Sequence, residues 1–562
     1  MNHVHPFLRL RKLLSKDRKD IIYLYTYAIL NGLVNLSLPL GIQAIIGLVL
    51  AGQVSTSWII LTMIVTIGIA VAGILQIVQL SITEILQQRI FAKSAFEFAY
   101  RIPRFNTESL GTQYPPELIN RFFDTLNIQK GLPKILMEFS ASSLQIIFGL
   151  ILLSFYHPVF IIFGIVLITV LVMIFYLTGP RGLESSLQES NFKYKVAHWL
   201  KELARSLNTF KLAGQTDLPV GRTDDLVQNY LTHRKKHFKV LILQYANIVG
   251  FKSLITLGLL VIGGMLVINN EINVGQFVAS EIIIILIMNS AEKLILTMEP
   301  IYDVLTAVEK ISNVTDLPLE DENGSLKFEE IDTGKGLALT LKKVNYLSKK
   351  DDGYILKDIS AQIDPNERVC ITGPNGSGKT TLINVITGLY DNYHGSIVIN
   401  DYPIGNLNEP ELRRHTGVAN IRDDVFGGTL QDNITLGRKG ITRENVKWAV
   451  DKLYLTDFVQ SLPEGFETRL ESSGGRLASS IVKKIILARA IVGNPKLIVM
   501  DDMWQAFSDE ERKKIIDFMT DPENNWTLLG ISTDPYFLSQ CDRVIIMQDG
   551  VIINDSKNNS HA

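Results

Sequence analysis

The chain contains no charged residue between Asp20 and Glu84, and this run restricts its possible folds more than any other feature. The run is too long for one membrane-spanning helix, which needs about 17 to 25 apolar residues. It suits two spans separated near Gly52–Ser55, and Pro39 is expected to kink the first of them. The residues are apolar on every side, whereas a helix on a soluble core keeps a polar face. We therefore expect helices that cross a membrane.

Two further pairs of apolar stretches follow the first pair, so we predict six spans in all. The hydrophobic content of 47% is high for a soluble protein, which agrees with membrane spans. The expected spans are about 21–50, 57–80, 139–156, 158–178, 241–268 and 275–291. They form a transmembrane domain over residues 1–313, which a polar linker over 314–335 joins to a second domain over 336–562.

Charged residues in the connections orient these spans. The three short connections carry no Lys or Arg and a single Glu, Glu271, whereas the N-terminus and the long connections (about 84–138 and 181–240) are rich in Lys and Arg. Positively charged loops stay in the cytoplasm, so the N-terminus, the long connections and the second domain are expected there. The two cysteines, Cys370 and Cys541, indicate no disulfide framework. A net charge of −2 gives no indication of a nucleic-acid partner.

Two ionisable residues fall within the predicted spans. Lys252 lies toward the cytoplasmic end of its span, where a long side chain can extend to the polar interface. Glu281 has two interpretations: it faces an internal pathway, or it packs between helices near the outer surface.

Residues 373–380 fit the phosphate-binding pattern G-x-x-x-x-G-K-[ST]. An apolar strand, Arg368–Thr372, precedes this loop, and a helix that ends near Gly388 follows it. Glycines let the backbone turn its N–H groups toward phosphate oxygens, and the helix N-terminus adds the positive end of its dipole. The expected nucleotide-binding residues are Gly373, Pro374, Asn375, Gly376, Ser377, Gly378, Lys379, Thr380 and Thr381.

The same loop and a later strand supply the expected metal ligands. Lys379 is expected to bridge the terminal phosphates, and the Thr380 hydroxyl is expected to bind Mg²⁺. The apolar strand Lys496–Met500 ends in Asp501 and Asp502, and Asp501 is expected to hold the same ion. Strands and helices alternate around these motifs, which predicts an α/β domain that takes ATP and Mg²⁺.

Six spans followed by a P-loop domain, with Leu487–Ala490 shortly before the acidic pair, resemble an ATP-binding-cassette (ABC) exporter half-transporter over nearly the whole chain. Within that family, Leu207–Gly214 and Ile272–Ala279 resemble the type I secretion, or haemolysin-exporter, branch. The resemblance implies a six-helix transmembrane domain of ABC exporter type followed by an α/β P-loop nucleotide-binding domain. It also implies a homodimer or a heterodimer with another ABC half-transporter, contact with membrane lipid, and a multi-pass location in a bacterial inner membrane. A periplasmic adaptor protein would be a further partner of this branch.

The motifs for hydrolysis depart from the family pattern. The position of the catalytic Glu holds Asp502, and the position of the switch His holds Thr533. No His lies between His415 and His561, so the loss of the switch does not depend on the alignment. The family's signature falls on Leu477, Ala478, Ser479 and Ser480, and Ser473–Arg476 imitates the signature too early in the chain.

Three other family positions also differ. The Q-loop Gln position holds Ile421, with Asn420 beside it, and the D-loop Asp position holds Ser508. The aromatic residue that stacks on adenine falls on Ser348, and the residues that could replace it are Tyr346 and Tyr354. The resemblance therefore implies an ATP site that is complete for binding and eroded for hydrolysis.

Two functions stay open at this point. The first is a subunit of an ABC exporter of the type I secretion kind, which binds ATP but hydrolyses it poorly. The second is a non-transporting ATP-binding regulator or assembly scaffold in the membrane. A soluble P-loop enzyme with a membrane anchor fits the sequence poorly, because six spans exceed what anchoring needs.

Overall fold

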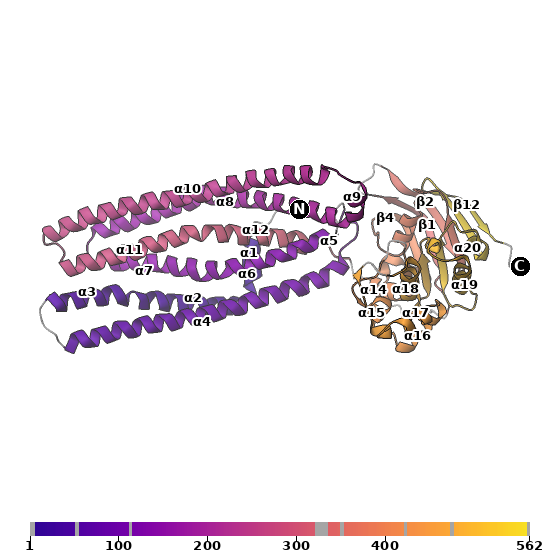
Figure 1. Ribbon diagram of the computed structural model, residues 1–562, viewed down its shortest axis with the longest axis horizontal. Helices are drawn as coiled ribbons and strands as arrows, with labels where there is room; N and C mark the ends of the chain where they lie inside the picture. The colour runs from indigo at the N-terminus through magenta and orange to yellow at the C-terminus, as the bar shows by residue number, and fades with distance from the viewer. Residues whose placement is uncertain are drawn as a thin grey trace. The chain divides into compact units, whose positions relative to one another are not determined.

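The computed structural model describes residues 6–50, 56–111, 115–320, 335–348, 353–420, 424–472 and 477–558. The chain forms two compact units (Figure 1). The helical unit comprises Met1–Arg104 and Gln113–Leu317, and the α/β unit comprises Phe105–Thr112 and Pro318–Ala562. Most of the predicted linker and the predicted break at Gly52–Ser55 lie outside the described residues.

The helical unit is built from long helices that pack side by side. Its helices are α1 (Pro6–Ser15), α2 (Arg18–Asn35), α3 (Ser37–Leu50), α4 (Thr56–Arg101), η1 (Ile102–Arg104), α5 (Pro115–Leu118), η2 (Ile119–Phe123), α6 (Asp124–Pro133), η3 (Lys134–Phe139), α7 (Ser140–Ser154), α8 (Val159–Arg205), α9 (Leu207–Leu212), α10 (Leu218–Ile268), α11 (Val274–Leu296) and α12 (Met298–Thr315). The main pairs are α2 with α4, α7 with α11, α8 with α10, and α6 with α12.

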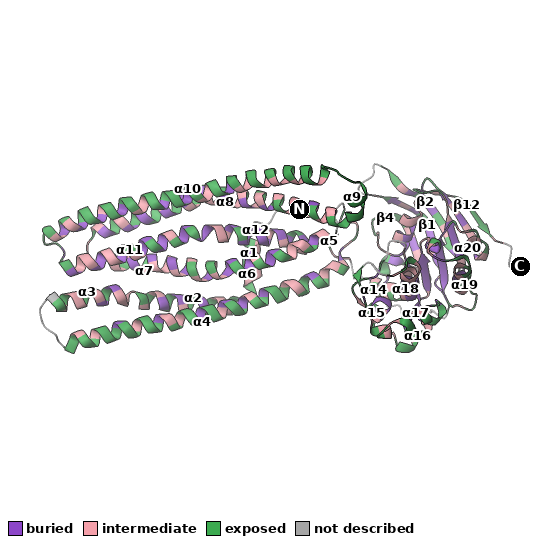
Figure 2. Cartoon of the chain, in the orientation of Figure 1, coloured by how far each residue is buried: buried purple, intermediate pink, exposed green. Residues whose placement is uncertain are grey.

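Among the residues that the structure describes, six helical stretches are long and apolar enough to cross a membrane, which confirms the six-helix transmembrane fold. They are Arg18–Val49, Thr56–Arg104, Pro115–Ser154, Val159–Arg205, Leu218–Ile268 and Val274–Thr315. The apolar windows of the first two are only 11% buried, and α4 exposes Ile64, Ile67 and Ile77 along its length (Figure 2). Exposed apolar faces of this size need lipid or another protein against them. The chain is therefore a multi-pass membrane protein.

The first span is interrupted just before the proline that was expected to kink it. Helix α2 ends at Asn35 and α3 begins at Ser37, so Pro39 is the third residue of α3. A proline in the first turn removes no helical hydrogen bond, because the first N–H groups of a helix have no acceptor within it. The break consequently falls at Leu36 instead of at the proline.

Lys252 has a partner that the sequence pattern did not indicate. Its Nζ lies 3.0 Å from Oε2 of Glu292 on α11. The hydroxyl of Tyr245 donates to Oε1 of the same carboxylate at 3.0 Å. Lys252 thus takes part in an ion pair between α10 and α11, where the sequence suggested an extension of the side chain toward the membrane surface.

The α/β unit contains two main sheets. Its strands are β1 (Leu339–Leu347), β2 (Tyr354–Ile363), β3 (Arg368–Thr372), β4 (Tyr393–Ile399), β5 (Tyr402–Pro403), β6 (Thr416–Ala419), β7 (Gly428–Thr429), β8 (Arg469–Leu470), β9 (Leu497–Met500), β10 (Thr527–Ile531), β11 (Arg543–Gln548) and β12 (Val551–Lys557). One sheet is antiparallel in the order β2-β1-β4-β5, the other has the order β12-β11-β3-β10-β9-β6, and β7 pairs with β8. In the six-stranded sheet, all neighbours are parallel except β11 and β12.

Helices cover this six-stranded sheet on both sides. They are α13 (Lys379–Ile386), α14 (Glu409–His415), α15 (Leu430–Thr435), α16 (Arg443–Lys452), α17 (Thr456–Ser461), α18 (Ser479–Ile491), α19 (Asp509–Met519) and α20 (Pro535–Gln540). Short 3-10 turns are η5 (Ile404–Asn406), η6 (Gly465–Glu467) and η8 (Trp504–Ala506).

Strand β9 shows why the central strands lack polar residues. Leu497 and Val499 pack into a core with α13 and the antiparallel sheet. Ile498 and Met500 pack into the opposite core with α15, α16, α18 and α19. Parallel strands that are buried on both faces form continuous apolar runs, and Figure 2 shows these strands as buried. The residues that follow such strands are the first that can reach solvent.

The connections between spans give a testable topology. His157 lies between α7 and α8, and Glu271 lies between α10 and α11. His157 Nε2 is 3.1 Å from Glu271 Oε2, so these two short connections lie at the same end of the bundle. We expect single cysteines at His157, Asn270 and Gln53 to react with a membrane-impermeant thiol reagent in intact cells. Gln53 lies outside the described residues. A cysteine at Lys211 should react only after permeabilisation.

The native cysteines make this labelling experiment simple to interpret. Cys370 and Cys541 are both buried in the α/β unit, so they should contribute little background. Labelling of a cysteine at position 211 in intact cells would contradict the orientation that the loop charges predict.

Candidate functional site

The predicted nucleotide residues lie at one edge of the six-stranded sheet. Strand β10 is flanked by β3 and β9, and all three run parallel. Their carboxyl ends therefore meet at the same edge, where ligands bind in open α/β sheets. The P-loop follows β3, Asp501 and Asp502 follow β9, and Thr533 follows β10.

Glycines give the P-loop its path. Gly373 has φ +140° and Gly378 has φ +93°, both in the region that side chains disfavour. A Cβ atom at Gly373 would lie 2.0 Å from the carbonyl oxygen of Met547, so only glycine fits there. Gly378 is the N-cap residue of α13, and the loop thus leads directly into the N-terminus of that helix.

The Lys379 side chain lies over the loop. Its Nζ donates to the carbonyl oxygens of Gly373 at 2.7 Å and Pro374 at 2.8 Å. Burial lowers the pKa of Lys379, and the charge of Asp501 opposes this shift. The ammonium group is therefore held against the backbone of the loop.

Side chains that follow β9 and β10 meet beside Thr380, which lies in the first turn of α13. Thr380 Oγ1 lies 3.4 Å from Asp501 Oδ2, and the backbone N–H of Asp502 donates to Asp501 Oδ1 at 2.9 Å. Thr533 Oγ1 lies 3.4 Å from Asp502 Oδ2, and Ser532 Oγ lies 3.5 Å from Asp502 Oδ1. The structure thus brings the residues at the catalytic-Glu and switch-His positions into contact.

Burial raises the pKa of Asp502 above its ordinary value. Hydrogen bonds from the backbone at Trp504 and Thr533 act in the opposite direction. The net effect is a raised pKa, because the Asp502 carboxyl group is partly withdrawn from water.

The signature segment begins helix α18. Ala478 is the N-cap residue, with φ −62° and ψ 143°, and its side chain makes no cap hydrogen bond. Helices prefer Ser, Thr, Asp or Asn there because a side-chain oxygen can accept from a free backbone N–H. Within the described part of the chain, no hydrogen bond joins Leu477–Ser480 to the P-loop of the same chain. The imitation of the signature at Ser473–Arg476 lies outside the described residues, as does Ile421 at the Q-loop Gln position.

The neighbouring family positions have structural partners. Asn420 follows β6, which pairs with β9. Ser508 is the N-cap of α19, where its hydroxyl accepts from the N–H of Glu511 at 3.4 Å. Arg489 of α18 donates to the carbonyl oxygens of Asn433 at 2.8 Å and Asp424 at 3.1 Å, so it links α15 and the segment before it to α18.

The structure separates the two aromatic candidates for the adenine position. Tyr346 is buried, lies parallel to the Tyr390 ring at a centroid distance of 5.1 Å, and donates its hydroxyl to Glu108. Its ring is therefore engaged within the α/β unit. Tyr354 is 46% exposed and precedes Ile355, whose carbonyl oxygen lies 3.2 Å from the Cβ position of Gly378 in the P-loop. Tyr354 is the aromatic residue with a free surface next to the P-loop.

A loop from the first half of the sequence belongs to the α/β unit, which sequence reasoning missed. Glu108 accepts hydrogen bonds from the Tyr346 hydroxyl at 2.7 Å and from the N–H groups of Asp391 at 3.2 Å and Asn392 at 3.0 Å. Asn106 donates to the Asp391 carboxylate at 2.9 Å. A single acid in a polar loop carries no motif, so no signal in the sequence indicated this contact.

Hydrogen bonds set the charge on Glu108. Burial alone would raise its pKa, but hydrogen bonds from Asp391, Tyr346 and two backbone N–H groups outweigh burial and lower the pKa. The pKa of Asp391 is raised, because its carboxyl group shares a hydrogen bond with Glu108. The shared hydrogen bond thus moves the pKa values of Glu108 and Asp391 in opposite directions.

Comparisons with known families match both units. Residues 21–291 match the model of the ABC transporter transmembrane region, and residues 356–505 match the model of the ABC transporter domain. A solved structure of a bacterial Atm1-family ABC exporter with ATP bound covers 96% of this chain and 95% of that chain at a TM-score of 0.84, with 16% identity. That structure shows the same fold. The chain belongs to the ABC transporters, and its order of domains is that of an exporter half-transporter.

Several curated relatives share part of the sequence. The ATP-dependent permease MDL1 of Candida albicans is 29% identical over 46% of this chain and 37% of its own length. The ATP-dependent lipid A-core flippase of Saccharophagus degradans is 30% identical, over 44% and 42% respectively. The alpha-hemolysin translocation ATP-binding protein HlyB of Escherichia coli is 28% identical, over 53% and 41%. The matched region spans less than half the length of each of these relatives.

The N-cap of α18 gives a prediction about stability. Ala478→Ser should stabilise the α/β unit by about 1 kcal/mol, because a serine oxygen can accept from a free N–H of the first turn. For a unit of this size, the midpoint of thermal unfolding should rise by roughly 2–4 °C. Ala478→Val is the matched control, because it adds bulk without an acceptor. An equal rise in both variants would contradict the capping argument.

The Glu108 contact gives a second prediction. Tyr346→Phe removes a hydrogen bond to a carboxylate, which should cost about 1 kcal/mol locally. Backbone amides of residues 106–111 should then exchange with deuterium roughly fivefold faster. Tyr390→Phe keeps the stacked rings and the Tyr346 hydroxyl, so exchange in that control should stay unchanged. Equal exchange in wild type and Tyr346→Phe would show that the hydroxyl does not hold this loop.

Proposed function

We propose that this chain is an ABC exporter subunit that binds ATP readily and hydrolyses it slowly. The observation that carries the proposal is the contact between Asp502 and Thr533, at 3.4 Å. By family resemblance, these positions hold a Glu that activates water and a His that acts as the switch. By the same resemblance, each of these positions here carries a different side chain from the one that hydrolysis uses.

The binding half of the site fits ATP with Mg²⁺. The P-loop backbone and α13 supply N–H groups for phosphate oxygens, and Lys379 supplies a positive charge. Mg²⁺ in such sites takes one or two protein oxygens together with phosphates and waters, and Thr380 with Asp501 offer that set. When bound, the ion neutralises charge that develops on the phosphates. Tyr354 is the residue that we assign to the adenine ring.

The side chains at the hydrolytic positions, Asp502 and Thr533, are shorter or less basic than those that the family uses. Asp502 is one methylene shorter than Glu, and a misplacement of about 1 Å can cost roughly a hundredfold in rate. Burial also raises the pKa of Asp502, while hydrogen bonds from the backbone at Trp504 and Thr533 oppose the shift. Thr533 offers a hydroxyl, which cannot accept and return a proton near neutral pH as imidazole does.

The signature segment also lacks groups that the family uses for hydrolysis. In the family, this segment caps the nucleotide held by the partner subunit through a serine hydroxyl and glycine N–H groups. Here Ala478 lacks the hydroxyl, and Ser479 and Ser480 stand where glycines would allow close approach. The exposed position of Ala478 at the start of α18 suits a contact with another subunit.

Pairing does not restore a complete site, whichever partner is present. In a homodimer, both composite sites would combine Asp502 and Thr533 with the altered signature. With an ideal half-transporter as partner, one site would keep Asp502 and Thr533, and the other would receive this chain's signature. ATP would then act chiefly as a clamp between two nucleotide-binding domains.

We place the dimer in a bacterial inner membrane with its nucleotide-binding domains in the cytoplasm. The similarity to HlyB and the segments Leu207–Gly214 and Ile272–Ala279 favour type I secretion, with a periplasmic adaptor as a further partner. The eroded hydrolytic residues also favour a second candidate, a non-transporting ATP-binding scaffold. ATP-dependent flux of cargo into inverted vesicles would occur only for the transporter.

Steady-state ATPase activity tests the proposal. In lipid, the purified protein should turn over at least about a hundredfold more slowly than the roughly 10 s⁻¹ typical of enzymes. Asp502→Glu should raise the rate by less than about tenfold in the homodimer, because Thr533 and the signature are unchanged. Lys379→Ala provides the blank, since it removes the charge that binds the terminal phosphates.

Nucleotide binding must be measured in the same preparation. ATP with Mg²⁺ should raise the unfolding temperature of the wild type and of Asp502→Glu, but not of Lys379→Ala, because a ligand stabilises the state that binds it. Turnover near 10 s⁻¹ in the wild type would show that the altered residues support hydrolysis.

A further inference from the structure

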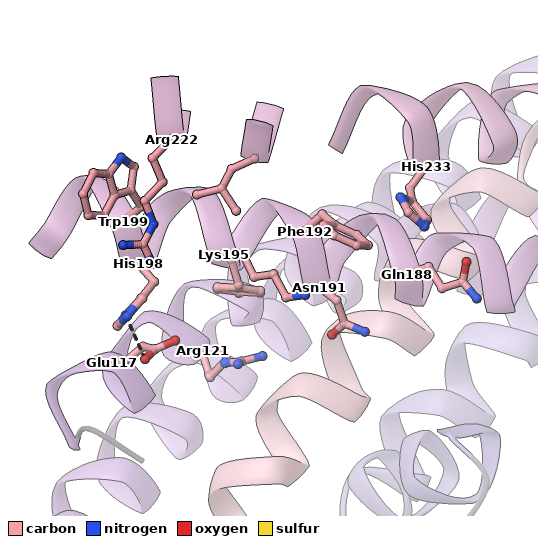
Figure 3. A pocket seen from close by; sticks show the side chains of 12 residues that line it. Glu117, Arg121, Gln188, Asn191, Phe192, Lys195, His198, Trp199, Arg222 and His233 are labelled. Atoms are coloured by element: carbon pink, nitrogen blue, oxygen red, sulfur yellow. Dashed lines mark ion pairs between the residues drawn. The ribbon is translucent and has the colours of Figure 1, made fainter. Parts of the chain in front are cut away.

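A groove of about 590 Å³ lies in the helical unit, remote in sequence from the P-loop and from every residue of the nucleotide site. Its lining comes from α5 and η2, from the part of α8 beyond the apolar segment, and from the N-terminal third of α10 (Figure 3). We call it the cationic groove, after the three positive side chains that line it: Arg121, Lys195 and Arg222. In Figure 3, Lys195 and Arg121 lie between the Trp199 end and the His233 end.

Each of the three cations rests on an aromatic ring. Arg121 Cζ lies 4.2 Å from the centroid of Tyr194, Lys195 Nζ lies 4.4 Å from that of Phe192, and Arg222 Cζ lies 4.4 Å from that of Trp199. Ring faces attract cations but leave their N–H groups free to donate. The rings thus position the charges without consuming their donors.

None of the three cations forms an ion pair with a carboxylate among the residues that the structure describes, although the charge of Arg121 acts through space on Asp124. Arg121 Nη1 is buried and makes no hydrogen bond within that part of the chain. A buried donor without an acceptor is unfavourable, and a guanidinium group offers a planar fork that matches phosphate or carboxylate oxygens. The orphaned donor therefore marks a position where an anionic oxygen would stabilise the protein.

The carboxylates near the groove are already engaged. Glu117, the acidic residue in its lining, lies 3.1 Å from His198 Nδ1. Asp124, behind the lining, accepts from the Tyr194 hydroxyl and lies 4.0 Å from Lys193. Neither acid pairs with Arg121, Lys195 or Arg222, so the groove keeps an excess of positive charge.

The walls of the groove are fixed to two helices. The rings of Phe192 on α8 and His233 on α10 are stacked, with centroids 4.2 Å apart and planes 22° apart. Trp199 Nε1 on α8 donates to Thr223 Oγ1 on α10 at 3.1 Å. These contacts tie α8 to α10 on both sides of the cations, so the groove is formed before a ligand arrives.

Distance from the membrane decides between a lipid and a solute as the ligand. The uncharged part of α8 ends at Arg181, and the groove lining on α8 begins at Gln188 and reaches Trp199. At about 1.5 Å per residue, the groove lies roughly 10–27 Å beyond that point. The headgroup layer is only about 5–8 Å thick on each side. A lipid headgroup at the membrane surface therefore falls short of it.

We propose that the cationic groove binds a small water-soluble organic anion that carries phosphate groups. Three cations supply charge-assisted hydrogen bonds to phosphate oxygens, the ring walls contact its organic part, and the volume is within the range of small-molecule sites. This binding is independent of the nucleotide site and goes beyond the export function proposed above. Because the ligand would contact η2, α8 and α10 together, it would link three helices of the helical unit.

Titration calorimetry with inorganic pyrophosphate tests the proposal. For this experiment, the protein carries the Lys379→Ala substitution, which removes binding at the P-loop. It is reconstituted in nanodiscs of neutral phosphatidylcholine. Pyrophosphate should bind this protein, and adding Lys195→Gln with Arg222→Gln should weaken binding roughly tenfold or more. Lys235→Gln with Lys236→Gln removes the same charge from exposed positions on α10 outside the groove, so affinity should stay unchanged. Arg121→Gln, tested separately, should also weaken binding.

Three outcomes would overturn the proposal. They are the absence of pyrophosphate binding, equal weakening in the groove variant and in its matched control, and displacement of pyrophosphate by anionic phosphatidylglycerol in the nanodisc. The last would identify a lipid headgroup as the source of the phosphate. Melting curves of the ligand-free variants separate a lost site from a lost fold, and Lys195→Gln alone, at an exposed position, provides a variant that should fold normally.

Discussion

The candidate nucleotide site depends on the parallel pairing of β3, β10 and β9. Thr527 pairs with Leu497, and Leu528 pairs with Arg368, which fixes where each strand ends. A shift of one residue would exchange the two faces of a strand, and the faces of β9 pack against different layers: an antiparallel sheet with α13 on one side, helices alone on the other. The packing of the strands thus sets the distances between the side chains that follow them.

Binding and hydrolysis of ATP place different demands on this frame. Phosphate binding relies on main-chain N–H groups and on one lysine, so it needs the path of the loop and little else. Hydrolysis relies on the lengths of particular side chains. The frame places Asp502 beside Thr533, but the shorter carboxylate ends about one carbon–carbon bond, or roughly 1.5 Å, before the point that a glutamate would reach. A fold can therefore keep its affinity for nucleotide while its catalytic side chains change.

The sequence predicted the features that local patterns encode. Apolar runs predicted six spans, because a spanning helix must be apolar over most of its length, and the P-loop pattern predicted an α/β domain around it. Contacts between distant residues were not predictable. Glu108 meets Tyr346 across 238 positions of sequence, and Lys252 meets Glu292 only because α10 and α11 pack together. The choice between Tyr346 and Tyr354 also needed the structure, since burial of a ring depends on the strands around it.

The segment Phe105–Thr112 changes what counts as a domain in this protein. The chain enters the α/β unit at Phe105, leaves it after Thr112, and returns at Pro318, so the two units are joined by three peptide connections instead of one. A fragment that begins at Pro318 would contain Tyr346 and the N–H groups of Asp391 and Asn392 but would lack Glu108, their common acceptor. Each added connection also reduces the conformational entropy that one unit gains when it separates from the other. The α/β unit is accordingly formed by two separate stretches of sequence and is defined by their contacts. An excised C-terminal fragment would therefore be less stable than the unit within the whole chain.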